Sequence, residues 1–156
     1  MHGPACAEAG EPMSDLPGSG TGFRDNWRIA SARDEIESVL QQVMVLLGGH
    51  DWDETSIFAV RLALEEGLSN AMRHGNSGDP GRLIQLELSG DHDGLLAAIE
   101  DEGPGYDPAS VPDPTADENL MVASGRGLAL IRAFMTEVTV VEPGNRLEIR
   151  YARPAM

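Results

Sequence analysis

Three short segments of the 156-residue chain combine residue types that can do chemistry. In the first, the carboxylate of Glu66 and the amide of Asn70 are four residues apart, so on a helix both side chains point into the same space. In the second, Asp101 is followed by Gly103 and Gly105, and these glycines let the backbone turn sharply and approach a ligand. The two segments together predict a ligand site.

The third segment is the run Gly125-Arg126-Gly127-Leu128. It is expected at a junction between a loop and a helix, where free backbone N–H groups and the helix dipole attract an anion. Each segment alone is common in ordinary turns. Their combination is more specific, because the spacing leaves room for a hairpin between the first two and a long loop between the last two.

Hydrophobic spacing predicts the elements that must position these residues. Three helices are expected: one through residues 36–47, one from Asp53 or Thr55 to about His74, and one over residues 127–135. Alternating apolar residues and turn signals predict five strands, over residues 27–30, 84–88, 95–99, 138–140 and 147–151. This order predicts an α+β two-layer sandwich, in which a mixed, mostly antiparallel sheet carries helices on one face.

The second predicted helix has two faces. Its apolar residues fall in one narrow sector, whereas Glu66, Asn70 and Arg73 group on the opposite side. A solvated polar face is the ordinary explanation for such residues. Gly67 counts against it, because glycine inside a helix costs about 1 kcal/mol relative to alanine and indicates that something packs closely there.

Outside these elements, the chain is rich in glycine and proline. Residues 1–25 contain little that could be buried and are expected to form a disordered tail, so the folded domain is predicted to span residues 26–153. Residues 104–124 contain four prolines and several acids. A loop of that length inside a compact domain is usually a functional lid or disordered.

Composition excludes several classes of protein. The net charge of −15 argues against binding to nucleic acid or to an anionic membrane. All eleven basic residues are Arg, which excludes a Walker-A ATPase, a eukaryotic-type protein kinase and Schiff-base chemistry, because each needs a lysine. Cys6 is the single cysteine, and no signal-peptide pattern or apolar run of membrane-spanning length is present. We therefore expect a cytoplasmic protein.

The three segments, in this order, resemble the N, G1 and G2 boxes of the Bergerat-fold ATPases, the superfamily of gyrase, MutL and histidine-kinase catalytic domains. Glu66 and Asn70 match the N box, Asp101-Glu-Gly103-Pro-Gly105 the G1 box, and Gly125-Arg126-Gly127-Leu128 the G2 box. The short length and the run from Ser124 to Ile131 are similar to the anti-sigma serine-protein kinases of bacterial partner-switching systems. The likeness covers roughly residues 27–152.

The resemblance implies a site for ATP and Mg²⁺. Asn70 would hold the Mg²⁺, Asp101 would accept a hydrogen bond from the adenine amino group, and Glu66 would be the general base. The remaining implied nucleotide-binding residues are glycines of the two glycine boxes, their neighbours and one basic residue of the N box: Arg73, Gly103, Gly105, Ser124, Gly125, Arg126, Gly127 and Leu128.

The resemblance also implies partners. A kinase of this type phosphorylates a serine on a small antagonist protein of the STAS type and, in its alternate state, holds a sigma factor; a homodimer is left open. The alternative is an ATP-dependent binding module with little or no kinase activity, because Ala123 occupies a position where some of these kinases have a basic residue. The catalytic domain of a histidine kinase is a third reading, disfavoured because the first 26 residues hold no dimerisation helices.

Overall fold

The computed structural model describes residues 22–104 and 123–154 of the chain. In chain order the elements are β1 (Phe23–Ala30), α2 (Arg33–Gly49), α3 (Glu54–Asn70), a π-helical turn (Ala71–Gly75), β2 (Leu83–Gly90), β3 (Gly94–Glu100), α4 (Ala123–Phe134), β4 (Glu137–Val141) and β5 (Arg146–Ala152). All the helices and strands expected from the sequence are therefore present. Residues 104–124, the expected long loop, lie mostly outside the described residues.

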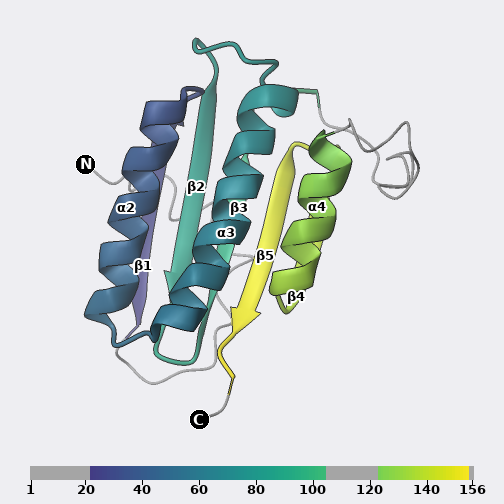
Figure 1. Ribbon diagram of the computed structural model, residues 1–156. Helices are drawn as coiled ribbons and strands as arrows, with labels where there is room; N and C mark the ends of the chain where they lie inside the picture. Colours follow the sequence, from purple (N-terminus) through teal and green to yellow (C-terminus); the bar gives the residue numbers. More distant parts are fainter. Residues whose placement is uncertain (1–21, 105–122, 155–156) are drawn as a thin grey trace.

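The five strands form one sheet in the order β1-β2-β3-β5-β4, and α2, α3 and α4 lie side by side over one face of it (Figure 1). This is the predicted two-layer sandwich. Every pairing between neighbouring strands is antiparallel. The prediction of a mostly antiparallel sheet is confirmed, but the sheet contains no parallel pair and so is not mixed. Strand β5 lies between β3 and β4, and this order brings the β4–β5 hairpin next to the end of β3.

The apolar stripes predicted from helical spacing form the core. Val39, Leu40 and Val43 of α2 and Val60 and Leu64 of α3 are at most 1% exposed and face the sheet. Gly67 lies where α3 crosses β3: a Cβ atom built on it would be 2.6 Å from Cδ1 of Ile99. The close packing inferred for this glycine is therefore present, and it lets α3 lie directly on the sheet.

Three boundaries differ from those expected. Strand β1 begins at Phe23 rather than at residue 27, because Phe23 pairs with Gly90 and its ring contacts that of His50. The first three residues of β1, Phe23, Arg24 and Asp25, therefore belong to a strand although they were assigned to the tail, while residues 1–21 lie outside the described part. Helix α4 begins at Ala123, so the Gly125–Gly127 run lies in its first two turns rather than before it.

The third difference is at the end of α3. The regular helix ends at Asn70 instead of His74 and continues as a π-helical turn, closed by a 2.8 Å hydrogen bond from the Asn76 N–H to the Ala71 carbonyl. The wider turn brings the Asn76 side chain to Ser31, Leu83 and Glu102. Turns of this kind are frequent at functional sites, and this one lies directly after the predicted site residue Asn70.

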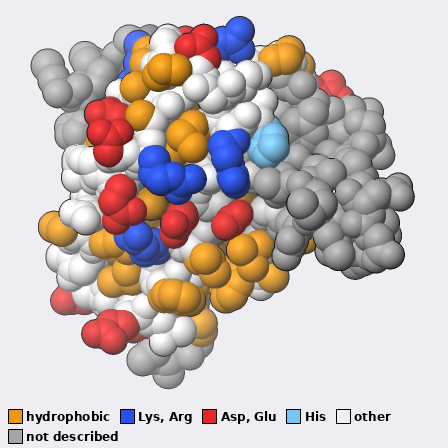
Figure 2. Space-filling view, turned by 45° about the horizontal axis from the view of Figure 1, so that its top comes forward, with side chains coloured by type: hydrophobic (Ala, Val, Ile, Leu, Met, Phe, Trp, Pro, Cys, Tyr) orange, Lys and Arg blue, Asp and Glu red, His pale blue; other side chains and the backbone are white. Residues whose placement is uncertain are grey.

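Charged side chains of both signs are mixed on the surface that Figure 2 displays, with hydrophobic side chains gathered beside them. The figure brings the upper end of Figure 1 forward. No broad field of one sign covers the described part of this face, so any attraction for an anion must arise locally. None of the helices that the structure describes is long and apolar enough to cross a membrane.

Asp53 fixes the start of α3, at the opposite end from Asn70. Its Oδ2 accepts a hydrogen bond from the Ser56 N–H at 3.0 Å, and its Oδ1 accepts one from Arg153 Nη2 at 2.8 Å. The Ser56 N–H, with a further contribution from Arg153, lowers the pKa of Asp53 from 3.8 to about 2. The ionised form is therefore favoured by folding, and this carboxylate stabilises the start of the helix.

We expect Asp53→Asn to lower Tm at neutral pH, because the amide keeps the cap acceptor but loses the charge. Since the folded pKa is depressed, the stabilisation is complete above pH 3.8 and is lost as the pH falls toward about 2. Thermal unfolding of the unsubstituted protein and of Asp53→Asn, from neutral pH down to about pH 2, measures the difference in Tm as a function of pH. Glu54→Gln, one residue further on, is the control, and a Tm difference that does not change with pH would contradict the assignment.

Candidate nucleotide site

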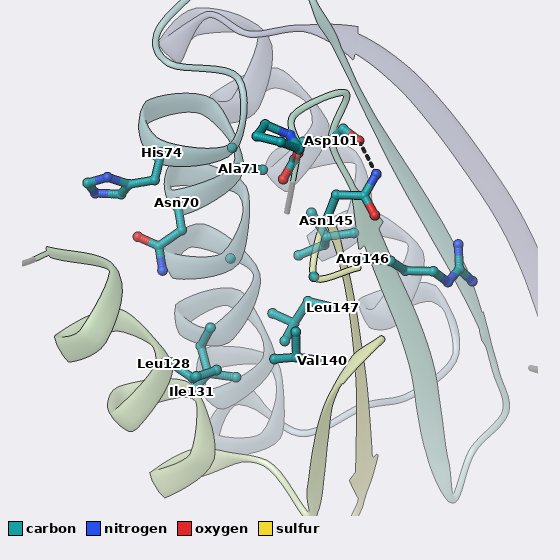
Figure 3. A pocket seen from close by; sticks show the side chains of 15 residues that line it. Asn70, Ala71, His74, Asp101, Leu128, Ile131, Val140, Asn145, Arg146 and Leu147 are labelled. Carbon is teal, nitrogen blue, oxygen red and sulfur yellow. Dashed lines mark hydrogen bonds between the residues drawn. The ribbon is translucent and has the colours of Figure 1, made fainter. Parts of the chain in front are cut away.

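A cavity of about 190 Å³ opens where three parts of the chain meet: the end of α3 with its π-helical turn, α4, and the junction of β3 with the β4–β5 hairpin (Figure 3). Its lining is largely apolar, with a few polar groups at the edges. The lining residues are Gly67, Asn70, Ala71, His74, Gly75, Ile99, Asp101, Pro104, Leu128, Ile131, Val140, Gly144, Asn145, Arg146 and Leu147. An apolar cavity with a few convergent polar groups is the usual form of a small-molecule site.

Asp101 supplies the carboxylate of this cavity. It follows the last residue of β3, and its Oδ1 accepts a hydrogen bond from the Gly103 N–H at 2.8 Å. Half-burial raises the pKa of Asp101 above its ordinary value, although the Gly103 N–H opposes the shift. Burial has removed water from the carboxylate, and no nearby cation fully compensates for the lost hydration. The carboxylate can therefore accept a further hydrogen bond from a ligand.

Two glycines pack against Asp101 so closely that a side chain could not replace their hydrogen. A Cβ atom built on Gly75 would overlap the Asp101 carboxylate, and one built on Gly103 would overlap the Gly75 carbonyl. The backbone of the π-helical turn and the backbone after β3 are therefore in direct contact. Gly103, predicted to shape the pocket, is not among the lining residues. It contacts the Asp101 carboxylate through its N–H group instead.

Glu66 and Asn70 come together at the other side of the cavity, beside α4. A Cβ atom built on Gly127 would lie 2.5 Å from Asn70 Nδ2 and 3.1 Å from Glu66 Oε1. Both side chains thus face the same point of α4, as their helical spacing predicted. Asn70 Oδ1 is buried and has no hydrogen-bond partner among the described residues. A buried polar oxygen of this kind can accept a hydrogen bond from water or a ligand, or bind a cation.

The other predicted residues have varied positions. Leu128 lines the cavity and is 5% exposed. Arg73 is exposed within the π-helical turn and is not a lining residue, because the turn departs from the helical spacing on which its placement relied. Gly105 lies outside the described residues, as do the side chains of Ser124 and Arg126 and the surroundings of Gly125.

Several lining residues were missed by the sequence analysis. Asn145 and Gly144 fall between the fourth and fifth predicted strands, and His74 and Gly75 fall at the predicted end of a helix. None of the four was named as a site residue. The pKa of His74 is lowered, first by partial burial and then by the charge of Arg73, which favours the neutral ring. Asn145 could not have been found from its own neighbourhood, because only the pairing of β3 with β5 brings it to Asp101.

Arg146 lines the cavity, yet its guanidinium points away from it (Figure 3). On the opposite face of the sheet it forms ion pairs with Glu148, Glu100 and Glu87 at 2.9, 3.0 and 3.1 Å. Burial alone lowers the pKa of Arg146, but the hydrogen bonds to these carboxylates raise it well above the ordinary value. Arg146 therefore holds the sheet together and is not available to a ligand in the cavity.

Comparison with known protein families gives a match to the profile described as the histidine kinase-like ATPase domain, over residues 29–151. The chain belongs to this family. The matched range includes every element from the end of β1 to β5, and with them the three segments singled out in the sequence. This agrees with the resemblance noted in the sequence. Comparison with curated protein sequences gives no match.

Among solved structures, the ATPase domain is similar to the crystal structure of the RsbU and RsbW domains of Rv1364c from Mycobacterium tuberculosis. The TM-score is 0.55 with 19% sequence identity, and the match covers 85% of this chain and 34% of that one. The present chain therefore spans about a third of the length of that protein. At this identity the likeness establishes the shared fold.

Asp101→Asn is expected to stabilise the ligand-free ATPase domain at neutral pH. Since burial raises the folded pKa of Asp101, the ionised carboxylate costs stability at pH values above that pKa, and the cost disappears as the carboxyl group is protonated. Tm of Asp101→Asn should exceed that of the unsubstituted protein at pH 7 and converge with it in acid. Glu102→Gln, an exposed neighbour, is the control, and a lower Tm of Asp101→Asn at pH 7 would contradict this account.

Proposed function

We propose that this domain binds ATP with Mg²⁺ and transfers the γ-phosphoryl group to a serine hydroxyl on a partner protein. The observation that carries the proposal is the placement of Asp101 and Asn70 on different walls of one apolar cavity, with Glu66 beside Asn70. One end of the cavity offers a hydrogen-bond acceptor for a base, and the other offers polar groups for phosphates. Membership in the histidine kinase-like ATPase family supports the same assignment.

Asp101 suits adenine better than guanine. Its carboxylate accepts hydrogen bonds, and adenine presents an amino group as donor on its pairing edge, whereas guanine presents a carbonyl oxygen at the same position. That oxygen would face the carboxylate with no proton between them. The apolar side chains of Ile99, Ile131 and Leu147 line the same cavity and provide surface for the flat ring.

Asn70 suits Mg²⁺ because its Oδ1 is a buried oxygen without a described partner. Mg²⁺ prefers oxygen ligands and is commonly bound through one or two protein groups together with phosphate oxygens and water. The described residues contain no cluster of three or more His, Cys, Asp or Glu that could hold a metal. A single amide oxygen next to bound phosphates is consistent with that chemistry. When bound, Mg²⁺ supplies positive charge to a site that has little of its own.

Glu66 suits the role of general base. It lies one helical turn before Asn70 and faces Gly127. It is half-buried and does not line the cavity, and we propose that the hydroxyl of a partner approaches it there. In the transfer, the serine oxygen forms a bond to the γ-phosphorus, the bond to the β-phosphate oxygen breaks, and the serine proton passes to Glu66. ADP leaves with the bond electrons.

The structural likeness to a protein with an RsbW domain, together with the resemblance to anti-sigma kinases, supports a regulatory role in partner switching. The partners we propose are a small antagonist of the STAS type with a phosphorylatable serine and a sigma factor, in the cytoplasm. A switch of this type couples the bound nucleotide to the choice of partner. Homodimerisation stays a prediction.

One observation favours the alternative of an ATP-dependent binding module with little kinase activity. Among the described residues, Arg146 is the one arginine that lines the cavity, and its guanidinium is committed to three carboxylates. Arg73 is exposed and outside the lining. Phosphoryl transfer usually benefits from cations on the transferred group, so a test of transfer itself is needed.

Glu66→Gln decides between the two functions. Removing a general base typically lowers the rate by 10²- to 10⁴-fold, so we expect transfer to a serine-bearing antagonist, or ATP hydrolysis in its absence, to fall by about that factor while ATP affinity stays unchanged. Radiolabelled ATP reports transfer, and calorimetry reports binding. Glu65→Gln, an adjacent half-buried carboxylate, is the matched control. Full activity in Glu66→Gln would remove Glu66 as the base.

Asn70→Ala tests the metal assignment. Without the amide oxygen, the gain in ATP affinity on adding Mg²⁺ should shrink several-fold, because one ligand of the ion is lost. Affinity for adenosine, which carries no phosphate, should not change. Titrations with and without Mg²⁺ measure both quantities. An unchanged Mg²⁺ dependence in Asn70→Ala would show that the ion binds elsewhere.

A further inference from the structure

Two asparagine side chains hold the turn that carries Asp101, one from each side. Asn76 Oδ1 accepts a hydrogen bond from the Glu102 N–H at 2.8 Å. On the other side, Asn145 Nδ2 donates to the Asp101 carbonyl at 3.0 Å, the contact drawn as a dashed line in Figure 3. Within the turn, the Gly103 N–H bonds to the Asp101 carboxylate. The backbone of three consecutive residues is thus fixed before any ligand arrives.

Asn145 holds both backbone groups of Asp101. The Asp101 N–H donates to the Asn145 carbonyl at 2.9 Å, and the side-chain amide of Asn145 donates in return to the Asp101 carbonyl. The ladder between β3 and β5 ends one residue earlier, at Glu100 and Arg146. Asn145 therefore extends the ladder by one step, with a side-chain amide as the second donor. Two hydrogen bonds to one residue fix its orientation as well as its position.

The two asparagines differ in what else they do. Asn76 is fully buried, and its Nδ2 also binds Ser31 Oγ and the Leu83 carbonyl, so it joins β1, β2 and the turn and belongs to the framework. Asn145 is half-buried, lines the cavity, and within the described residues its side chain is hydrogen-bonded to Asp101. A change at Asn145 can therefore affect Asp101 without opening the core.

We propose that Asn145 is the positioning residue that sets selectivity for the base, by aiming the Asp101 carboxylate into the cavity. This inference rests on the proposed function, because it assigns Asp101 the role of adenine acceptor. A turn held in its binding geometry loses little conformational freedom when the ligand binds, so its rigidity contributes to affinity for the base and not for the phosphates.

The test compares Asn145→Ala with the unsubstituted full-length chain in titrations with ATP, GTP and tripolyphosphate, all with Mg²⁺. Loss of one hydrogen bond should weaken ATP binding by roughly threefold to tenfold. Binding of GTP and tripolyphosphate should change by less than about twofold, so that the ATP-to-GTP ratio falls with ATP affinity. Glu142→Ala, an exposed residue of the same hairpin, is the matched control and should leave every value unchanged.

A merely structural role gives a different result. If Asn145 only stabilised the hairpin, Asn145→Ala would lower Tm and weaken all three ligands equally, which would overturn the inference, as would unchanged ATP affinity and selectivity. Asn145→Leu, which keeps the size of the side chain but loses the donor without adding a charge, carries the same test if the alanine variant does not fold. Failure of the unsubstituted chain to bind ATP would instead refute the proposed function on which this inference rests.

Discussion

The partly buried carboxylate of Asp101 is the constraint on which the rest of the site depends. It lies at the edge of an apolar cavity, where burial raises its pKa, and it is packed against backbone so closely that Gly75 and Gly103 must be glycine. Burying such a group costs free energy unless hydrogen bonds compensate for the lost water. The Gly103 N–H donates one such bond to the carboxylate, and the two flanking asparagines hold the backbone of the turn.

The scaffold explains how residues far apart in sequence reach one cavity. Strand β5 lies between β3 and β4, so the hairpin that follows α4 returns to the end of β3 and supplies Asn145. Helix α3 lies close to the sheet because Gly67 has no side chain, and it carries Glu66 and Asn70 to the same end. Helix α4 completes the cavity from the third side. Most of the lining residues lie near the ends of helices and strands, whereas Leu128 and Ile131 come from the middle of α4.

The chemistry-bearing segments could be predicted from the sequence because their signals are local. Helical spacing placed Glu66 and Asn70 on one face, and glycines on either side of Pro104 indicated the turn after Asp101. The contacts that fix the site are not local. Asn145 reaches Asp101 through the register of β3 with β5, which no single-sequence pattern specifies, and it was not predicted as a site residue.

The end of α3 also differs from the one predicted. Regular helix was expected through His74, but the π-helical turn begins at Ala71 and leaves Arg73 exposed and outside the cavity lining. The turn is closed by Asn76, whose side chain is buried among groups from β1, β2 and the segment after β3. A helix end set by such distant partners cannot be located by propensity, which describes only neighbours in sequence.

Calorimetric titration of the full chain with ATP and with GTP, each in the presence and absence of Mg²⁺, tests the central claim most directly. A site built around the Asp101 carboxylate and the Asn70 oxygen predicts ATP binding that strengthens with Mg²⁺, and GTP binding weaker by at least about tenfold, the cost of unpaired polar groups at the base. Equal affinity for the two nucleotides, or no binding of ATP, would contradict it.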